Sequence, residues 1–157
     1  MDVRELTRTE CTTLLTHNHV AHLACASSAQ QPYIVPIYVA YDVDEEILYG
    51  FSTSGQKIDF LRSNPRACVE IDEIDAKGER WSSVIIQGHF EELTDSPEHE
   101  AARKRAYELL KRHASWWVPA YLRTPEEKAR NQTNSLEPIY FRITIEELSG
   151  RRVDRAA

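Results

Sequence analysis

Apolar and polar residues alternate along much of the chain with the period of β-strands. In residues 66–74, Ala67, Val69 and Ile71 point to one face, and the polar or thiol side chains between them point to the other. Pro36 lies within another strand-like segment and cannot donate to a ladder, so that strand should lie at an edge or carry a bulge there. The further segments with strand-like composition are residues 20–26, 33–41, 47–53, 81–93 and 138–148.

Helix signals interrupt the strands at four places. Residues 7–10 read Thr-Arg-Thr-Glu, which is the pattern of a capping box at the start of a helix. Ile58 and Leu61 are three residues apart and predict a short helix that stops before an Asn-Pro pair. Residues 96–98 (Ser-Pro-Glu) predict the start of the longest helix, and residues 124–127 (Thr-Pro-Glu-Glu) predict a shorter one.

The order of these elements favours a mostly β, antiparallel barrel of six to seven strands with a few peripheral helices. Consecutive hairpins without β-α-β spacing disfavour a doubly wound parallel sheet. The 157 residues fit one domain with a sizeable core. We assign residues 1–150 to that domain and residues 151–157 to a flexible C-terminal tail.

Composition limits the classes of partner and compartment. The formal net charge is −6, from 25 acidic and 19 basic residues, so nucleic acid is not expected as a partner. The three cysteines (Cys11, Cys25 and Cys68) form no C-x-x-C pair, which indicates reduced thiols in a reducing compartment. No segment is typical of a signal peptide or a membrane span, so we expect a cytoplasmic protein.

The segment from Phe51 to Lys57 carries the candidate chemistry. Three hydroxyl residues end a strand, Gly55 follows, and Lys57 falls in the first turn of the predicted helix. The N–H groups that begin a helix attract anions, and hydroxyl and ammonium groups add to this, so the segment suits a phosphomonoester. It does not match a P-loop, which disfavours ATP hydrolysis. The alternative interpretation is structural, with Ser54 as a helix cap and Lys57 as an exposed lysine.

Three segments in this order resemble the FMN-binding split-barrel proteins related to pyridoxamine phosphate oxidase. They are residues 32–42 (PYIVPIYVAYD), 47–72 (ILYGFSTSGQKIDFLRSNPRACVEID) and 81–93 (WSSVIIQGHFEEL). The branch with the nitroimidazole-resistance-type reductases is the most similar. The resemblance implies a split barrel of Greek-key type, bound FMN, and a homodimer with two flavins at the subunit interface.

The resemblance also assigns residues to the flavin. Lys57 is implied as the cation of the FMN phosphate, and the segment around it as phosphate or ribityl contacts. A neighbouring strand is implied to lie along the ring, and a Trp-Ser-Ser segment to approach it. The cofactor-binding residues implied in this way are Val35, Pro36, Ile37, Tyr38, Phe51, Ser52, Thr53, Gln56, Lys57, Trp81, Ser82 and Ser83.

One departure from the family concerns catalysis. Many members of that branch carry a histidine on the strand before the phosphate segment, where this chain reads Leu-Tyr-Gly-Phe at residues 48–51. No general acid or base can be named. The resemblance implies an FMN-dependent oxidoreductase, with NAD(P)H as reductant and a small planar or electron-poor substrate. The alternatives are a flavin- or haem-binding module without turnover, and a barrel that binds a deazaflavin, for which only Lys57 and Arg62 would be near the longer acidic tail.

Three other groups of residues have both a structural and a functional interpretation. His17, His19 and His22 lie close in sequence but lack adjacent cysteine or acidic ligands, so no metal site is expected and His22 is interpreted as a core residue. The acidic residues between Glu70 and Asp75 are interpreted as a solvated face. Trp116 and Trp117 either pack structurally or line the substrate side of the flavin.

Overall fold

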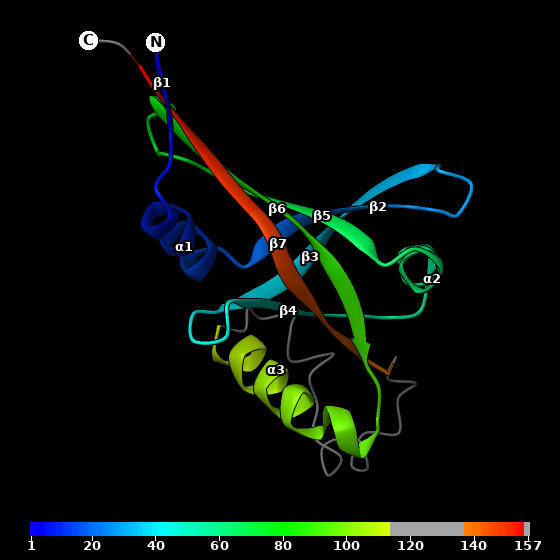
Figure 1. Cartoon of the computed structure of the whole chain (residues 1–157). Coiled ribbons are helices and arrows are strands. Elements are labelled where there is room, and N and C mark those ends of the chain that lie inside the picture. The colour runs from blue at the N-terminus through cyan, green and yellow to red at the C-terminus, as the bar shows by residue number, and fades with distance from the viewer. Residues whose placement is uncertain (114–136, 156–157) are drawn as a thin grey trace.

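The structure is a computed structural model that describes residues 1–113 and 137–155 (Figure 1). The predicted helix start at residues 124–127 and the Trp116–Trp117 segment lie outside the described residues. The elements are β1 (Asp2–Glu5), α1 (Arg8–His17), β2 (Val20–Ala26), β3 (Pro32–Asp42), β4 (Ile47–Ser52), α2 (Gln56–Ser63), β5 (Arg66–Ile74), β6 (Arg80–Leu93), a 3₁₀ turn (Pro97–His99), α3 (Glu100–Arg112) and β7 (Ile139–Asp154).

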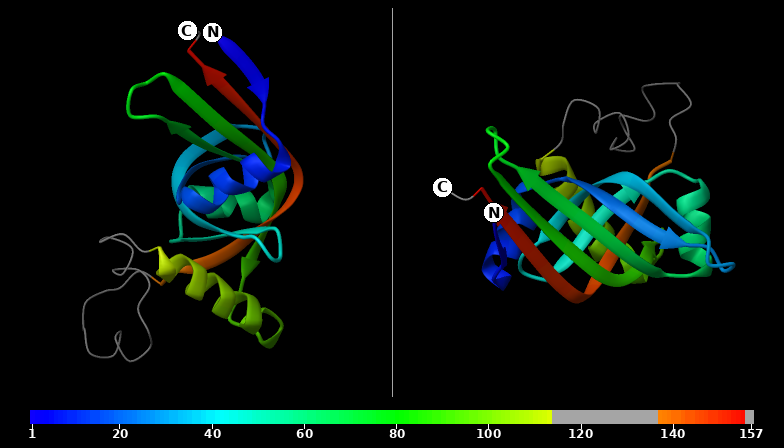
Figure 2. Two further views of the ribbon diagram at one scale, coloured as in Figure 1. Left: turned by 90° about the vertical axis from the view of Figure 1, so that its left-hand side faces the viewer. Right: turned by 90° about the horizontal axis from the view of Figure 1, so that it is seen from above.

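The strands form one antiparallel sheet that closes on itself. Their order is β1-β7-β4-β3-β2-β5-β6, and β7 also pairs with β6. Six strands, β2 to β7, therefore form a ring, and β1 pairs with the last residues of β7. The views in Figures 1 and 2 place α1 and α2 at opposite ends of this barrel. The predicted split-barrel fold class is thereby confirmed. Among the described residues, no helix is long and apolar enough to cross a membrane.

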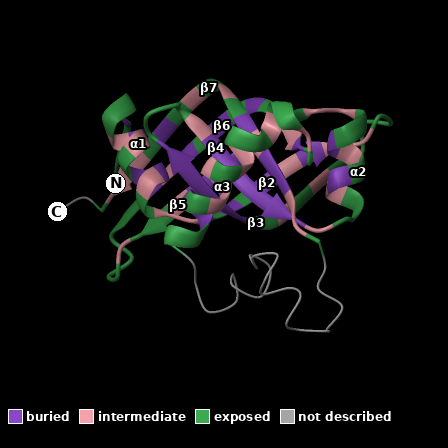
Figure 3. Ribbon diagram, turned by 90° about the horizontal axis from the view of Figure 1, so that it is seen from below, coloured by how far each residue is buried: buried purple, intermediate pink, exposed green. Residues whose placement is uncertain are grey.

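The predicted alternation in β5 is confirmed by burial. Ala67, Val69 and Ile71 face the barrel interior, and Val69 lies in register between Leu23 of β2 and Ile86 of β6. These three registered side chains are 0–1% exposed, which makes them the centre of one continuous core. Figure 3 shows buried positions gathered on the strands, and a second buried cluster lies where α3 packs against β3, β4 and β7.

Pro36 occupies a local edge, as its missing N–H requires. β3 pairs with β2 from Pro32 to Tyr38, but it pairs with β4 only from Tyr38 onward. The first half of β3 therefore has a strand on one side only, although the strand lies inside the sheet order. The expectation of an edge position holds for this half of the strand, and no bulge is needed.

Near both ends of the chain the structure contains β-strand that the pattern of apolar residues does not predict. The sequence pattern predicts that the last strand ends near residue 148, but β7 continues to Asp154, so most of the predicted tail is paired with β1 and β6. β1 is four residues long, with every residue exposed, and therefore shows no buried face that a periodicity search could detect. The capping box of α1 is present as predicted, with Thr7 and Glu10 bonded reciprocally.

An ion pair between the buried Asp42 and the partly exposed Arg105 joins the β3–β4 hairpin to α3. The Asp42 carboxylate is 1% exposed and accepts a 2.9 Å hydrogen bond from Arg105 Nη2 and a 3.1 Å bond from the Asp44 backbone N–H. The Arg105 hydrogen bonds lower the pKa of Asp42, with backbone donors adding to the effect. The pair therefore fixes α3 over the strand that begins at Pro32.

We predict that Asp42→Asn destabilises the protein mainly at neutral pH. Because the folded-state pKa of Asp42 is depressed, its contribution is present above the pKa of the unfolded carboxyl and is lost as pH falls through the folded value. The variant should lower Tm by about 5 °C at pH 7, and the difference from wild type should shrink below about pH 4. Asp44→Asn, at an 88% exposed carboxylate, is the control and should change Tm little at any pH.

A second stability prediction concerns Gly50. A Cβ at this position would lie 2.3 Å from a ring atom of Phe141, which is fully buried on the neighbouring strand β7. Gly50→Ala should therefore destabilise by about 1–3 kcal/mol, measured by urea unfolding. Gly55→Ala is the control, since a Cβ there meets nothing within 4 Å. Equal stability of the two variants would contradict the proposed packing.

Candidate functional site

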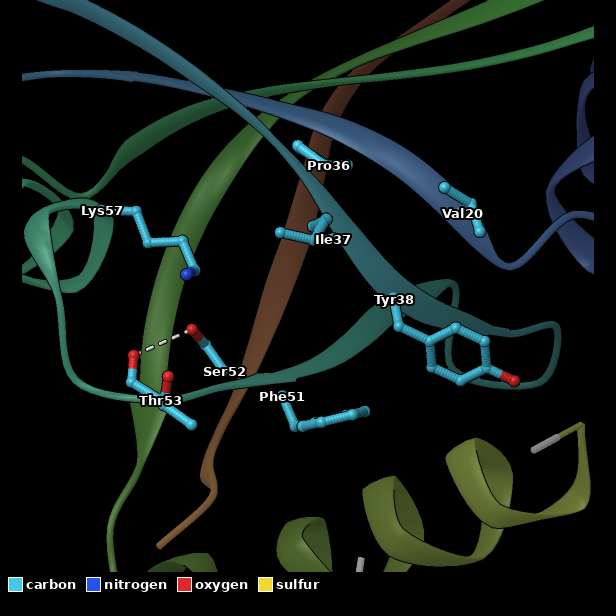
Figure 4. Close-up of a pocket in the computed structure, with 8 residues that line it drawn as sticks. All are labelled: Val20, Pro36, Ile37, Tyr38, Phe51, Ser52, Thr53 and Lys57. Carbon is cyan, nitrogen blue, oxygen red and sulfur yellow. Dashed lines mark hydrogen bonds between the residues drawn. The ribbon is translucent and has the colours of Figure 1, made fainter. Parts of the chain in front are cut away.

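A cavity of about 400 Å³ opens beside β3, the end of β4 and the start of α2 (Figure 4). Seven of the twelve residues implied by the resemblance line it. Among the residues that the structure describes, the lining is Val20, Pro36, Ile37, Tyr38, Phe51, Ser52, Thr53 and Lys57. The structure thus brings the strand segment and the phosphate segment, which are separate in sequence, to one cavity.

One end of the cavity is polar and suits an anion. Ser52 is buried at the end of β4 and donates a 3.0 Å hydrogen bond to the Thr53 carbonyl, and Lys57 stands in the first turn of α2. In Figure 4 the Lys57 side chain extends toward the side of the cavity where the Ser52 and Thr53 hydroxyls lie. The N-cap of α2 is Gly55 and not Ser54, which argues against the purely structural interpretation of this segment.

The positive charge at this end is not neutralised within the chain as described. No ion pair in the described residues joins Lys57 to a carboxylate. The N-terminus of α2 adds partial positive charge from its first-turn N–H groups, which receive no side-chain cap from Gly55. An ammonium, two hydroxyls and a helix start therefore converge where a phosphate would be stabilised.

The opposite end of the cavity is apolar and aromatic. Tyr38 and Phe51 are both buried, with ring centroids 6.2 Å apart. The Tyr38 hydroxyl donates to the His113 carbonyl at the end of α3, and burial raises the pKa of this phenol. Tyr38 therefore remains a protonated wall of the cavity. Such surfaces pack well against a flat aromatic ring.

Two histidines lie behind Tyr38. The rings of His19 and His113 stack at 4.3 Å, and His19 Nδ1 is 3.2 Å from the Val39 carbonyl oxygen. Burial lowers the pKa of His19, and His113 contributes in the same direction. Neither residue is part of the cavity lining, so they support Tyr38 and do not enlarge the site.

Five of the implied residues lie outside the cavity of their own chain. Val35 packs against the barrel core, and Gln56 is exposed at the start of α2. Trp81 is 51% exposed near the start of β6. Ser82 accepts a 3.0 Å bond from Arg152 and lines a different cavity of about 520 Å³, and Ser83 lines a third.

Val20 is the lining residue that sequence reasoning missed. It lies opposite Tyr38 in the β2–β3 ladder, and its side chain is 56% exposed at the cavity edge. Its local sequence is an ordinary apolar strand, and only the cross-strand register identifies it. Arg62 is the second cation expected near a longer acidic cofactor tail. It is occupied by two hydrogen bonds of 2.8 and 2.9 Å to Glu92.

The interpretation of His22 as a core residue is wrong. His22 shares a face with Val20, as expected, but that face is the outer one, because Leu23 points inward. The three nearby histidines also separate. His17 Nδ1 lies 2.7 Å from the Thr13 carbonyl, His19 contacts Val39, and His22 lies beside Glu70.

Comparisons with known proteins agree with this arrangement. The profile of the family described as pyridoxamine 5'-phosphate oxidase matches residues 7–152. The uncharacterized protein RA0666 of Rhizobium meliloti is 38% identical over 154 residues, which is 96% of this chain and 95% of that protein.

Solved structures give the same result. A FAD-binding protein of Mesorhizobium loti is 42% identical and superposes with a TM-score of 0.76, covering 98% of this chain and all of the other. A proposed 5-nitroimidazole antibiotic resistance protein of Bacteroides thetaiotaomicron shares the fold at 16% identity and a TM-score of 0.66, covering 97% of this chain and 89% of the other. The chain therefore belongs to the pyridoxamine 5'-phosphate oxidase family.

Proposed function

We propose that this protein is a flavoprotein that binds FMN in the cavity between Lys57 and Tyr38. The observation that carries the proposal is the chemical asymmetry of that single cavity. One end presents Lys57 without an ion-pair partner in the described chain, and the other presents apolar and aromatic walls. FMN has the same asymmetry, with a phosphate at one end and a flat ring at the other.

Each lining group has a distinct role in this proposal. Lys57 and the first-turn N–H groups of α2 bind the phosphate, and the Thr53 hydroxyl donates to its oxygens or to the ribityl chain. The Ser52 hydroxyl donates to the Thr53 carbonyl, so it would accept from a ribityl hydroxyl or rotate to donate to the phosphate. Pro36 and Ile37 pack along the ring and exclude water from it. The bound flavin would supply electron transfer, while the protein orients it and controls access.

The proposed activity is oxidoreduction of a small planar or electron-poor substrate with NAD(P)H as reductant. The cavity walls place no acidic or basic side chain other than Lys57 at the site within the described residues. Burial keeps Tyr38 protonated, and its hydroxyl is engaged with His113. Chemistry at this site would accordingly rest on the flavin, with the chain acting through orientation and exclusion of water.

FAD is the second candidate cofactor, and a specific finding favours it. The 42% identical Mesorhizobium loti protein is described as FAD-binding. A single lysine at the polar end fits the one phosphate of FMN, whereas FAD carries a diphosphate and an adenosine that need further contacts. Chromatography of the cofactor released from the purified protein, together with the Kd of each flavin, separates the two.

We predict that Lys57→Ala weakens FMN binding at least tenfold while leaving riboflavin binding unchanged. Riboflavin lacks the phosphate, so the loss of the ammonium should affect FMN alone. Flavin fluorescence titration of the apoprotein measures both constants. Lys77→Ala, in the β5–β6 turn, is the matched control. Equal losses for FMN and riboflavin would contradict a phosphate role for Lys57.

The absorption spectrum of the purified protein distinguishes turnover from mere binding. We expect a flavin spectrum that NADH or NADPH bleaches and that an electron acceptor restores. A flavin that no nicotinamide reduces would favour a binding module without turnover. A haem band in place of a flavin spectrum would refute the flavin proposal. No histidine lines the cavity among the described residues, so such a haem would need an axial ligand from elsewhere.

We also propose a homodimer with the flavin at its interface. Val20 and Ile34 are large apolar side chains, 56% and 65% exposed, on the outer face of the sheet next to the cavity. Ile85, 41% exposed, lies on the same face of the sheet, on β6. Burying them against a second copy would remove this apolar surface from water. In such a dimer the partner subunit, and not the same chain, would have to supply the implied Trp-Ser-Ser contacts of residues 81–83.

Ile34→Asp should shift the protein toward monomer in size-exclusion chromatography with light scattering. A carboxylate at the centre of an apolar interface would be desolvated without a partner. Val43→Asp is the control, because Val43 is similarly exposed at 51% but lies in the β3–β4 turn. A monomeric wild-type protein at micromolar concentration would refute the dimer.

A further inference from the structure

A second cluster of chemically active side chains lies on the outer face of the sheet. His22 of β2 stands directly opposite Glu70 of β5, and Asp72 is two residues further along β5 on the same face. His22 Nδ1 is 3.1 Å from Glu70 Oε2. One potential ligand atom from each of the three residues lies within 4.8 Å of the other two.

We propose that His22, Glu70 and Asp72 form a binding site for a divalent transition-metal ion, with Zn²⁺ as its prototype. Imidazole nitrogens and carboxylate oxygens are both established zinc ligands, and three protein ligands with water in the fourth position is a known arrangement. Ligand atoms around tetrahedral zinc lie about 3.3 Å apart, given bonds of about 2.0–2.1 Å. Small side-chain rotations would bring the three atoms to that spacing, and water or a further ligand would complete the ion's coordination.

The charge balance of this face supports a cation there. Glu70 and Asp72 are neighbouring carboxylates on one face of β5, and like charges so placed repel. No ion pair in the described residues joins either of them to a lysine or arginine. His22 is the described partner of Glu70, and the His22 side chain is 47% exposed in the single chain.

The scaffold under the cluster is rigid. Leu23 and Val69, the residues adjacent to His22 and Glu70, are in register with each other and are buried in the barrel core. The backbone that carries the ligands is thereby fixed, and only side-chain rotations are needed for binding. The three ligands belong to one chain and lie outside the cavity lining, so the site does not require the flavin. They share the outer face of the sheet with Val20 and Ile85, so in the proposed dimer the ion would lie at or near the subunit interface.

Isothermal titration of the EDTA-treated protein with ZnCl₂ tests the site. We expect wild-type protein to bind Zn²⁺, and His22→Ala and Asp72→Asn each to weaken binding at least tenfold. His89→Ala is the matched control, because His89 is also exposed on the outer face of a strand, but its registered neighbours are Arg66 and Thr144. Mg²⁺ should bind more weakly than Zn²⁺, since it prefers oxygen ligands.

The melting temperature, Tm, distinguishes Zn²⁺ binding at the folded site from nonspecific binding. Zn²⁺ should raise the Tm of wild-type protein and of His89→Ala, but not of His22→Ala, because only binding to the folded site stabilises. Cys68→Ser should leave affinity unchanged, which separates this site from a thiol site on the same strand. Equal zinc affinity in wild type and His22→Ala would overturn the proposal, as would loss of binding in Cys68→Ser alone.

Discussion

The double pairing of β7 is the constraint on which the rest of the structure depends. β7 bonds to β4 on one side and to β6 on the other, and this closes six strands into a ring. The closure requires the ring of Phe141 to lie directly against Gly50, where no larger residue fits without movement. A register shift between Gln87 and Gly88 lets the long β6–β7 ladder bend around the barrel.

The shape of the cavity depends on this closure of the barrel and on the attachment of α3. β4 is held in place by its pairing with β7. The Ser52 and Thr53 hydroxyls at the end of β4 therefore lie at the same cavity as residues 36–38 of β3. Two contacts then connect β3 to α3, namely the pair between Asp42 and Arg105 and the hydrogen bond from Tyr38 to His113. The aromatic end of the cavity is thus supported by a helix, while Lys57 at its polar end is carried by α2.

Local sequence patterns predict much of the fold and part of the candidate site. The alternation in residues 66–74 and the capping box at Thr7 are determined by nearest neighbours in sequence, and the structure shows both. The hydroxyl, glycine and lysine residues after β4 likewise form a local pattern. The full extent of β7 did not follow from any such pattern, since its last residues gain strand structure only by pairing with β1 and β6.

The sequence by itself indicated the succession of most strands and helices along the chain and the antiparallel barrel class, and it singled out Lys57 as a candidate phosphate contact. Tertiary structure alone decided which face of β2 is outside, and so placed His22 beside Glu70 and Asp72 instead of in the core. It also decided that Val20 borders the cavity and that Ser82 does not. The physical reason is that a strand's period shows which residues share a face, whereas only the pairing of distant strands shows what that face meets.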